Sequence, residues 1–169
     1  MSEHNEHNEP NELYEINELN ELNEPNDSTY QMKIYRFVDL ECWQEARKFV
    51  NMVYRAIKSS RSFQSDHRLK DQSTGAAISV MNNISEGWAS QSNAEFIRFL
   101  TYSRRSCAEV QNCFYVALDQ EYITENILKE VHNQATKVIM ILDGLLRYLR
   151  SQRSQRLKRN YFSKRDERT

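Results

Sequence analysis

The residues with the most evident chemical use are arginines and lysines near the C-terminal end of the chain. Residues 147–169 hold nine bases against two acids, a net charge of +7. Four of the arginines recur at every third position, so on a helix they lie roughly on one side and turn slowly around it. Because Arg can donate two hydrogen bonds to one phosphate, such a row can follow a nucleic-acid backbone. The candidate contacts are Arg147, Arg150, Arg153, Arg156, Lys158 and Arg159.

The same cations also have a structural explanation. Positive charges near the C-terminal end of a helix complement its dipole, and a charged tail stays soluble without any partner. A second group of cations, Arg98, Arg104 and Arg105, falls on a different predicted helix and offers another contact surface. The sequence therefore identifies two candidate nucleic-acid surfaces and leaves the structural explanation open.

Polar residues that could form a site also repeat along two predicted helices. They are Gln72, Ser79, Asn83, Glu86, Gly87 and Glu109. Two facing carboxylates could act as an acid and a base, but neither a nucleophile–base set nor the Glu-x-x-His motif of di-iron bundles accompanies them. The histidines of the helical region also lack the spacing of metal ligands. We therefore expect no catalytic activity, no cofactor and no metal. We interpret these residues as a hydrogen-bonded network between helices, with partner binding as the alternative.

Charge is divided unequally along the chain, although the formal net charge of the whole is only -1. Residues 1–31 hold nine acids and no Lys or Arg, which leaves the rest of the chain with a net charge of +8. Glutamate recurs at every third position from residue 3 to residue 24, a period that forms no stable helical face, so we expect disorder. This acidic tail is either a neutral repeat expansion or a segment that folds back on the basic domain. We divide the chain into this tail, a helical domain at residues 32–150 and a basic extension at residues 151–169.

Hydrophobic periodicity predicts four helices, at about residues 40–58, 67–86, 92–117 and from 125 onward. The predicted N-caps of the first, third and fourth helices are Asp39, Ser92 and Thr124, and Gly87 is the predicted C-cap of the second. Residues 59–66 are predicted as a loop. No proline follows residue 31, which argues against a loop-rich β fold. Because the connections are short, consecutive helices should be antiparallel. The expected fold class is all-α, an up-and-down antiparallel four-helix bundle with a disordered N-terminal tail.

The fourth predicted helix carries two adjacent apolar seams, which is more than the core of one bundle requires. Either both seams are buried within the bundle, or the second seam forms a contact between subunits. The candidate interface residues on the second seam are Leu128, Ile139, Leu142, Leu146 and Leu149. The sequence leaves these two explanations open.

Three cysteines, at positions 42, 107 and 113, form an odd count without a Cys-x-x-Cys motif. We interpret them as reduced thiols inside helices, as in a cytoplasmic protein. No apolar run approaches the length of about 18 residues that a membrane-spanning helix needs, so we expect no membrane span.

A resemblance to a known family appears in the second and third predicted helices. Residues 79–87, S-V-M-N-N-I-S-E-G, resemble the S-I-x-x-N-I-A-E-G signature of a bacterial four-helix bundle family. That family includes the 23S rRNA intervening sequence proteins and the accessory variability proteins of diversity-generating retroelements. Further matches, in the same order along the chain, are Leu40 with Trp43, Leu69 with Gln72, Glu95-Phe96 with Phe99-Leu100, Ser106 with Glu109, and Tyr122-Ile123. The chain departs from the pattern where Thr74-Gly75 replace a frequent basic pair and Ser85 replaces alanine.

The resemblance covers about residues 36–150 and implies a ring-like homo-oligomer, a pentamer, without catalytic activity. In the retroelement branch it also implies binding to nucleic acid and to a reverse transcriptase. Our leading hypothesis is a non-enzymatic homo-oligomer that binds RNA, an RNA–protein complex or DNA through its basic surfaces. The alternative is a protein-interaction scaffold with no nucleic-acid role of its own.

Overall fold

The computed structural model describes the backbone of residues 34–166 and the side chains of residues 34–155. The acidic tail, with its predicted disorder, lies outside the described residues, as do residues 167–169. Within the described range the chain forms only helices. They are the 3-10 turn η1 (Phe37–Asp39), α2 (Glu41–Lys58), α3 (Arg61–Ser65), α4 (His67–Ala89), α5 (Asn93–Asp119) and α6 (Glu125–Asp166). The predicted all-α fold class is confirmed.

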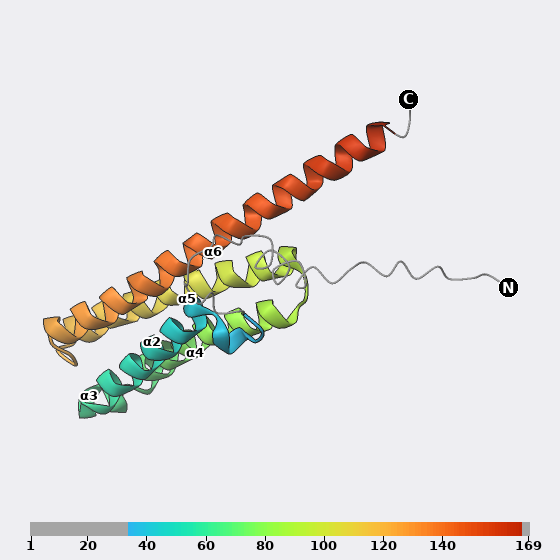
Figure 1. Cartoon of the computed structure of the whole chain (residues 1–169). Helices are drawn as coiled ribbons and strands as arrows, with labels where there is room; N and C mark the ends of the chain where they lie inside the picture. The colour runs from blue at the N-terminus through green and yellow to red at the C-terminus, as the bar shows by residue number, and fades with distance from the viewer. Residues whose placement is uncertain (1–33, 167–169) are drawn as a thin grey trace, which may run out of the picture.

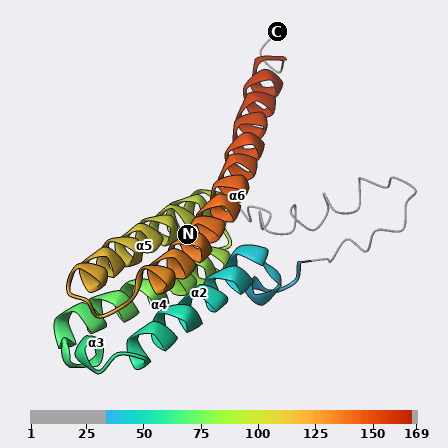
Figure 2. The same ribbon diagram turned by 90° about the vertical axis from the view of Figure 1, so that its left-hand side faces the viewer.

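The four long helices pack side by side, in the order α2, α4, α5 and α6, and α6 also contacts α2 (Figure 1). α5 runs antiparallel to α6, because Arg104 pairs with Asp143 while Gln111, farther along α5, contacts His132, nearer the start of α6. α4 and α5 are also antiparallel and are joined by a short turn (Figure 2). The long helices therefore enclose one hydrophobic core.

In the third predicted helix, core-type residues recur at alternating spacings of four and three, which predicts one seam that faces the core. All of its residues are buried on α5: Phe96, Leu100, Ser103, Cys107, Val110, Phe114 and Ala117. The predicted N-caps at Ser92 and Thr124 are also observed, since each side-chain oxygen accepts a backbone N–H three residues later. These local patterns fix where α5 and α6 begin and which side of α5 faces the core.

On α6 the buried stripe changes from one predicted seam to the other. Val131 and Val138 of the first seam are buried near the start of the helix. Toward the end, Leu142, Leu146 and Leu149 of the second seam are 0%, 3% and 1% exposed within the single chain. This burial corrects their assignment to a subunit interface and leaves Leu128 and Ile139 half-buried. The physical reason is that a straight α-helix drifts by about 20° per heptad relative to a 3.5-residue repeat.

Two predicted boundaries near α2 were wrong. Asp39 does not cap α2; it lies in η1, where its carboxylate accepts the backbone N–H of Tyr35 and Arg36 at 3.2 and 2.9 Å. Residues 59–66, predicted as a loop, contain α3, whose N-terminus is capped by the Ser60 hydroxyl. The short helix places Phe63 in the core, where it is fully buried.

Gly87 does not end α4 as a C-cap, because the helix continues to Ala89. The chain reverses instead at Gln91, whose φ of 53° is left-handed. Gly87 is buried against α5: a Cβ atom there would lie 2.8 Å from Phe96 Cδ2 and 2.8 Å from Phe99 Cβ. Glycine is therefore required at this position for the close approach of α4 and α5.

A buried carboxylate joins α2 to α6. Glu45 is 6% exposed, and the Gln134 side-chain amide donates to its Oε2 at 2.8 Å and to its backbone carbonyl at 3.0 Å. Lys48 and Lys137 approach Oε1 to 2.7 and 3.1 Å. The hydrogen bonds from Lys48 and Gln134, with a further contribution from Lys137, lower the pKa of Glu45 from 4.5 to about 2. The carboxylate is therefore ionised at neutral pH and fixes α6 in register with α2.

The Gly87→Ala variant should lower the free energy of unfolding by about 1–3 kcal/mol, because the added methyl group overpacks the α4–α5 contact. Gly75→Ala is the matched control on the same helix, since a Cβ atom there meets nothing within 4 Å. This control should instead raise the free energy of unfolding by about 0.5–1 kcal/mol, because alanine favours the helix. Urea unfolding followed by circular dichroism measures both. Wild-type stability of Gly87→Ala would show that the close approach is not required.

The Glu45→Gln variant should lose a pH-dependent part of the stability. A carboxylate with a lowered folded-state pKa stabilises the fold fully above its unfolded pKa of 4.5, and this stabilisation disappears as the pH falls to about 2. At neutral pH the free energy of unfolding of the wild type should exceed that of the variant by on the order of 2 kcal/mol. This difference should fall to zero as the pH is lowered from 4.5 to about 2. Urea titrations at several pH values measure it, with Glu41→Gln, an exposed residue of α2, as control. A difference that does not change with pH would contradict the assignment.

Candidate nucleic-acid interface

α6 extends well past the rest of the bundle. Leu149 is its last core residue among those described, but the helix continues to Asp166. The remaining residues, 150–166, form a projecting segment of roughly 25 Å at 1.5 Å per residue. Both ribbon views show α6 extending beyond the ends of the other helices (Figure 1, Figure 2). As far as residue 166, the basic extension predicted from the sequence is thus a continuation of α6.

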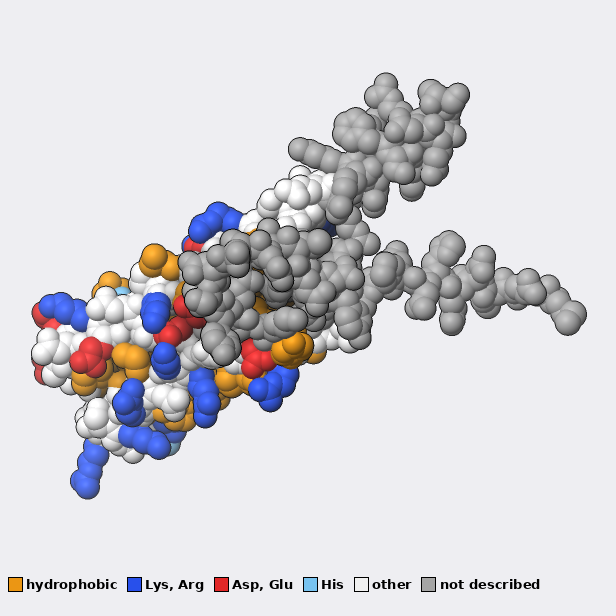
Figure 3. Space-filling view, viewed as in Figure 1, with side chains coloured by type: hydrophobic (Ala, Val, Ile, Leu, Met, Phe, Trp, Pro, Cys, Tyr) orange, Lys and Arg blue, Asp and Glu red, His pale blue; other side chains and the backbone are white. Residues whose placement is uncertain are grey.

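The net positive charge of the helical region is concentrated on this end of α6. Residues 34–146 contain thirteen bases and thirteen acids, so the bundle itself is neutral. On the face seen in Figure 3, Lys and Arg side chains are interspersed with Asp, Glu and apolar groups. The projecting segment, in contrast, carries seven bases and one acid. An anionic ligand is therefore attracted to the end of α6 and not to the bundle as a whole.

The structure places three of the predicted arginines in solvent. Arg147, Arg150 and Arg153 are exposed on α6. Arg156, Lys158 and Arg159 belong to the same helix, with side chains outside the described range. The exposed guanidinium groups follow the helix at intervals of about 4.5 Å along its axis.

The alternative arginines on α5 are engaged within the chain. Arg98 Nη2 lies 2.7 Å from a carboxylate oxygen of Glu95, and Arg104 Nε lies 2.9 Å from a carboxylate oxygen of Asp143. The Arg105 guanidinium sits over the Tyr102 ring, 5.7 Å from its centroid. Two of the three charges are thus already balanced by acids, and a phosphate would have to displace them.

The signature residues are brought together only in part. Asn83 Nδ2 donates to the Ser79 carbonyl and hydroxyl at 2.7 and 3.0 Å, and the Ser106 hydroxyl donates to Ser79 Oγ at 3.1 Å. The Ser103 hydroxyl donates to the Val80 carbonyl at 2.9 Å. The bonds from Ser106 and Ser103 tie α4 to α5, whereas the two Asn83 bonds stay within α4, and Gln72, Glu86 and Glu109 are exposed. The network is therefore a structural contact between helices.

The two carboxylates cannot form an acid–base pair. In the register that sets Ser79 beside Ser106, Glu109 lies level with residue 76 of α4. Glu86 is ten residues farther along α4, a separation of about 15 Å along the axis. Catalysis by this pair is excluded by distance.

Glu45 and Ser103 are buried polar residues that the sequence patterns did not identify. Each is a polar residue placed at core spacing among apolar ones: Glu45 lies three residues after Cys42 and four before Phe49, both buried. A polar side chain on a buried face must find a partner, because an unpaired one is costly. That placement is the signal that could have identified both residues.

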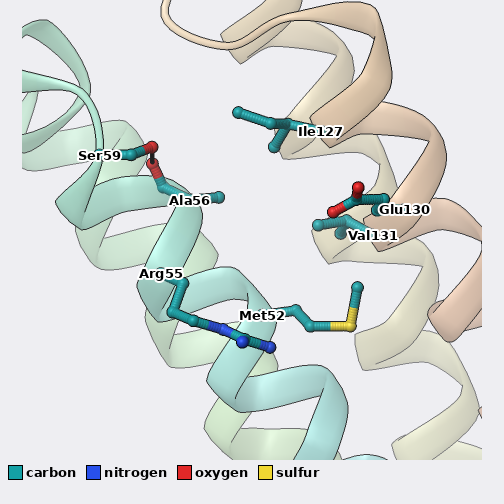
Figure 4. Close-up of a pocket in the computed structure, with 7 residues that line it drawn as sticks. All are labelled: Met52, Arg55, Ala56, Ser59, Ile127, Glu130 and Val131. Carbon is teal, nitrogen blue, oxygen red and sulfur yellow. Dashed lines mark hydrogen bonds between the residues drawn. The ribbon is translucent and has the colours of Figure 1, made fainter.

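A pocket of about 280 Å³ lies between α2 and α6, near the end of the bundle opposite the projecting segment (Figure 4). Met52 and Ala56 on α2 face Ile127 and Val131 on α6, with Arg55 and Glu130 at the sides. The Ser59 hydroxyl donates to the Ala56 carbonyl at 2.8 Å and is not activated by a base. The lining has no nucleophile–base arrangement, and no cluster of metal-ligating side chains occurs among the residues the structure describes.

The cysteines are buried and free, in agreement with their interpretation as reduced thiols. Burial raises the pKa of Cys42 and of Cys107 to about 12, and it also raises the pKa of Cys113. Their thiols are protonated at neutral pH and are poor nucleophiles. In the described part of the chain, no helix is both long enough and apolar enough to cross a bilayer.

Comparison with known proteins identifies the family. Residues 38–144 match the family described as 23S rRNA-intervening sequence protein, a match that ends before the first C-terminal arginine. A similar solved structure is that of a protein with unknown function from the S23 ribosomal protein family of Bacteroides thetaiotaomicron. It is 21% identical, with a TM-score of 0.58 over 62% of this chain and 97% of that chain, and this likeness shows the fold alone. No curated protein matches. Because the family match covers more than half of its length, this chain belongs to the 23S rRNA-intervening sequence protein family.

Proposed function

We propose that this protein binds RNA, without catalysing a reaction on it, through the basic end of α6. The observation that carries the proposal is the placement of the charge: the bundle is neutral, and the cations gather on a helix that extends past it. The family description, which names an intervening sequence of 23S rRNA, supports RNA as the class of ligand. On this proposal the protein acts in the cytoplasm.

The geometry favours recognition of the RNA backbone. Arginines three residues apart advance about 4.5 Å and rotate by about 60° around the helix, so the row from residue 147 to residue 156 covers half a turn. A flexible single strand can follow such a path and place phosphates against successive guanidinium groups. Phosphates carry no sequence information, so this contact tolerates any base sequence.

A scaffold function remains the second candidate, and exposed apolar side chains on α6 favour it. Met140 and Tyr148 are 67% and 41% exposed, two turns apart and close to the basic end. The homo-oligomer implied by the family resemblance could use this surface together with the half-buried Leu128 and Ile139. We propose that the chain assembles through this part of α6, with the arginines left in solvent.

Binding of a fluorescent 20-nucleotide uridine strand should fall steeply with salt, and the Arg150→Gln, Arg153→Gln, Arg156→Gln triple variant should flatten that dependence. Each lost phosphate contact reduces the slope of log K against log salt by roughly 0.7 for single strands, so three reduce it by about 2. Fluorescence anisotropy at several salt concentrations measures the slope.

The matched control removes three cations at the opposite end of the bundle. Lys58, Arg61 and Arg68 are exposed, and their replacement by Gln changes the net charge by the same amount. This control should keep the wild-type slope. Absence of binding by the wild type at low salt would end the RNA proposal and leave the scaffold. If the slope of log K against log salt is equal in the wild type and the α6 variant, the RNA contacts a surface other than these three arginines.

Light scattering at micromolar concentration should report a mass several times the 20.2 kDa of one chain. Met140→Glu should lower this mass, because the side chain is exposed in the single chain and a charge there would be buried only on assembly. Asn82→Glu, an exposed position on α4, is the control and should leave the mass unchanged. A wild-type monomer would contradict assembly.

A further inference from the structure

The point where the acidic tail joins the bundle lies at the end from which α6 projects. Glu45 is level with Gln134, and α2 and α6 are antiparallel, so moving from Glu45 toward the N-terminus leads along α6 toward its C-terminal half. Ile34 and Phe37 pack against the core just before α2 begins. Figure 2 shows the start of α2 and the departure of α6 at the same end of the bundle. The tail is thus tethered beside the base of the projecting segment.

The two chain ends are complementary in charge, and the bundle between them is neutral. Residues 1–31 hold nine acids and no Lys or Arg, whereas residues 147–169 have a net charge of +7. Two acids of the bundle near the base of α6 are paired within the chain: Asp143 with Arg104, and Glu95 with Arg98. The tail is therefore the acid-rich partner within reach of the C-terminal cations.

The tether also has a suitable length. For 31 residues, a random-coil polymer has a root-mean-square span of about 30 Å, close to the roughly 25 Å of the projecting segment. A partner tethered at such a matched distance acts at an effective concentration on the order of millimolar. Even a weak contact with a dissociation constant of about 0.1 mM would then be formed in roughly nine chains out of ten.

We propose that residues 1–31 bind the projecting segment of α6 in the same chain, and that RNA has to displace them. The second half of this statement rests on the proposed RNA function, whereas the contact itself does not. The tail makes bound RNA compete with an internal polyanion, so only a ligand with a higher charge density occupies the helix.

The spacing of the charges determines the kind of contact. Three residues of extended chain span about 10 Å, whereas three residues of helix span about 4.5 Å, so glutamates and arginines that each recur every third residue cannot pair one to one. The contact depends on the number of charges and not on their order. A tail with the same composition in a shuffled order retains it, and a tail without the charges does not.

The test compares three full-length proteins: the wild type, a variant with Gln at the eight tail glutamates, and a variant with residues 3–26 in shuffled order. The probe is the fluorescent 20-nucleotide uridine strand. At about 50 mM salt the Gln variant should bind roughly ten-fold more tightly than the wild type, and the shuffled variant should match the wild type. The difference should fall below about two-fold near 0.5 M salt, where the Debye length is only a few ångströms.

A second measurement does not involve RNA. Dyes on Ser2→Cys and Ser163→Cys report the distance between the tail and α6 by energy transfer, and the buried native thiols react slowly by comparison. Energy transfer in the wild type should be high at low salt, should fall at high salt, and should not depend on protein concentration. The Gln variant should show low transfer throughout.

The outcomes separate the two proposals. Energy transfer that ignores salt, that is equal in the Gln variant, or that requires high protein concentration would overturn the contact within one chain. Equal RNA affinity of the wild type and the Gln variant would overturn the competition. Salt-dependent energy transfer without RNA binding by any of the three proteins would sustain the contact and overturn only the RNA function.

Discussion

The buried stripe along α6 is the contact on which the rest of the structure depends. Val131, Val138 and Leu142 complete the core that α2, α4 and α5 leave open on one side. The same stripe ends at Leu149, so it also decides where the helix leaves the bundle. Glu45 adds what apolar packing lacks, a polar contact that fixes the register of α6 against α2. The apolar residues that seat α6 in the bundle thus determine where the cations of the projecting segment lie.

The contact between α4 and α5 shows a different way of holding two helices together. Small residues at Gly87, Ser79, Ser103 and Ser106 let the backbones approach, and their hydroxyl groups bond across the contact or to the neighbouring backbone. The signature recognised in the sequence therefore describes a packing requirement. Its carboxylates, Glu86 and Glu109, stay in solvent and are free of that requirement.

What the sequence predicted well is what depends on near neighbours along the chain. The seam of α5 and the caps at Ser92 and Thr124 are set by residues three or four positions apart. The errors concern partners that are distant in sequence. Gly87 was predicted as a C-cap, but glycine is required there because a side chain would collide with Phe96 and Phe99 on the next helix. That requirement cannot be seen from the neighbouring residues in the sequence.

Partners still farther along the chain were missed altogether. Glu45 was missed because Gln134 lies 89 residues away. The sequence left open whether the leucines of α6 lie in the core or at a subunit interface, because a sequence pattern does not show which seam of the helix faces its neighbours. In the candidate site, the sequence could identify the row of arginines, but not that Arg98 and Arg104 are paired with Glu95 and Asp143.

The unbroken length of α6 gives the molecule a mechanical property. A helix of 42 residues without proline behaves as a stiff rod, of which residues 125–149 lie in the bundle and residues 150–166 project from it. A tilt of about 10° at Leu149 moves the tip by roughly 4 Å, given the 1.5 Å rise per residue. Conversely, a load applied at the tip by a bound ligand is transmitted as torque to Gln134 and Glu45, the polar contact nearest the pivot on the α2 side. The bundle thus anchors one end of a rigid helix whose other end carries the positive charge.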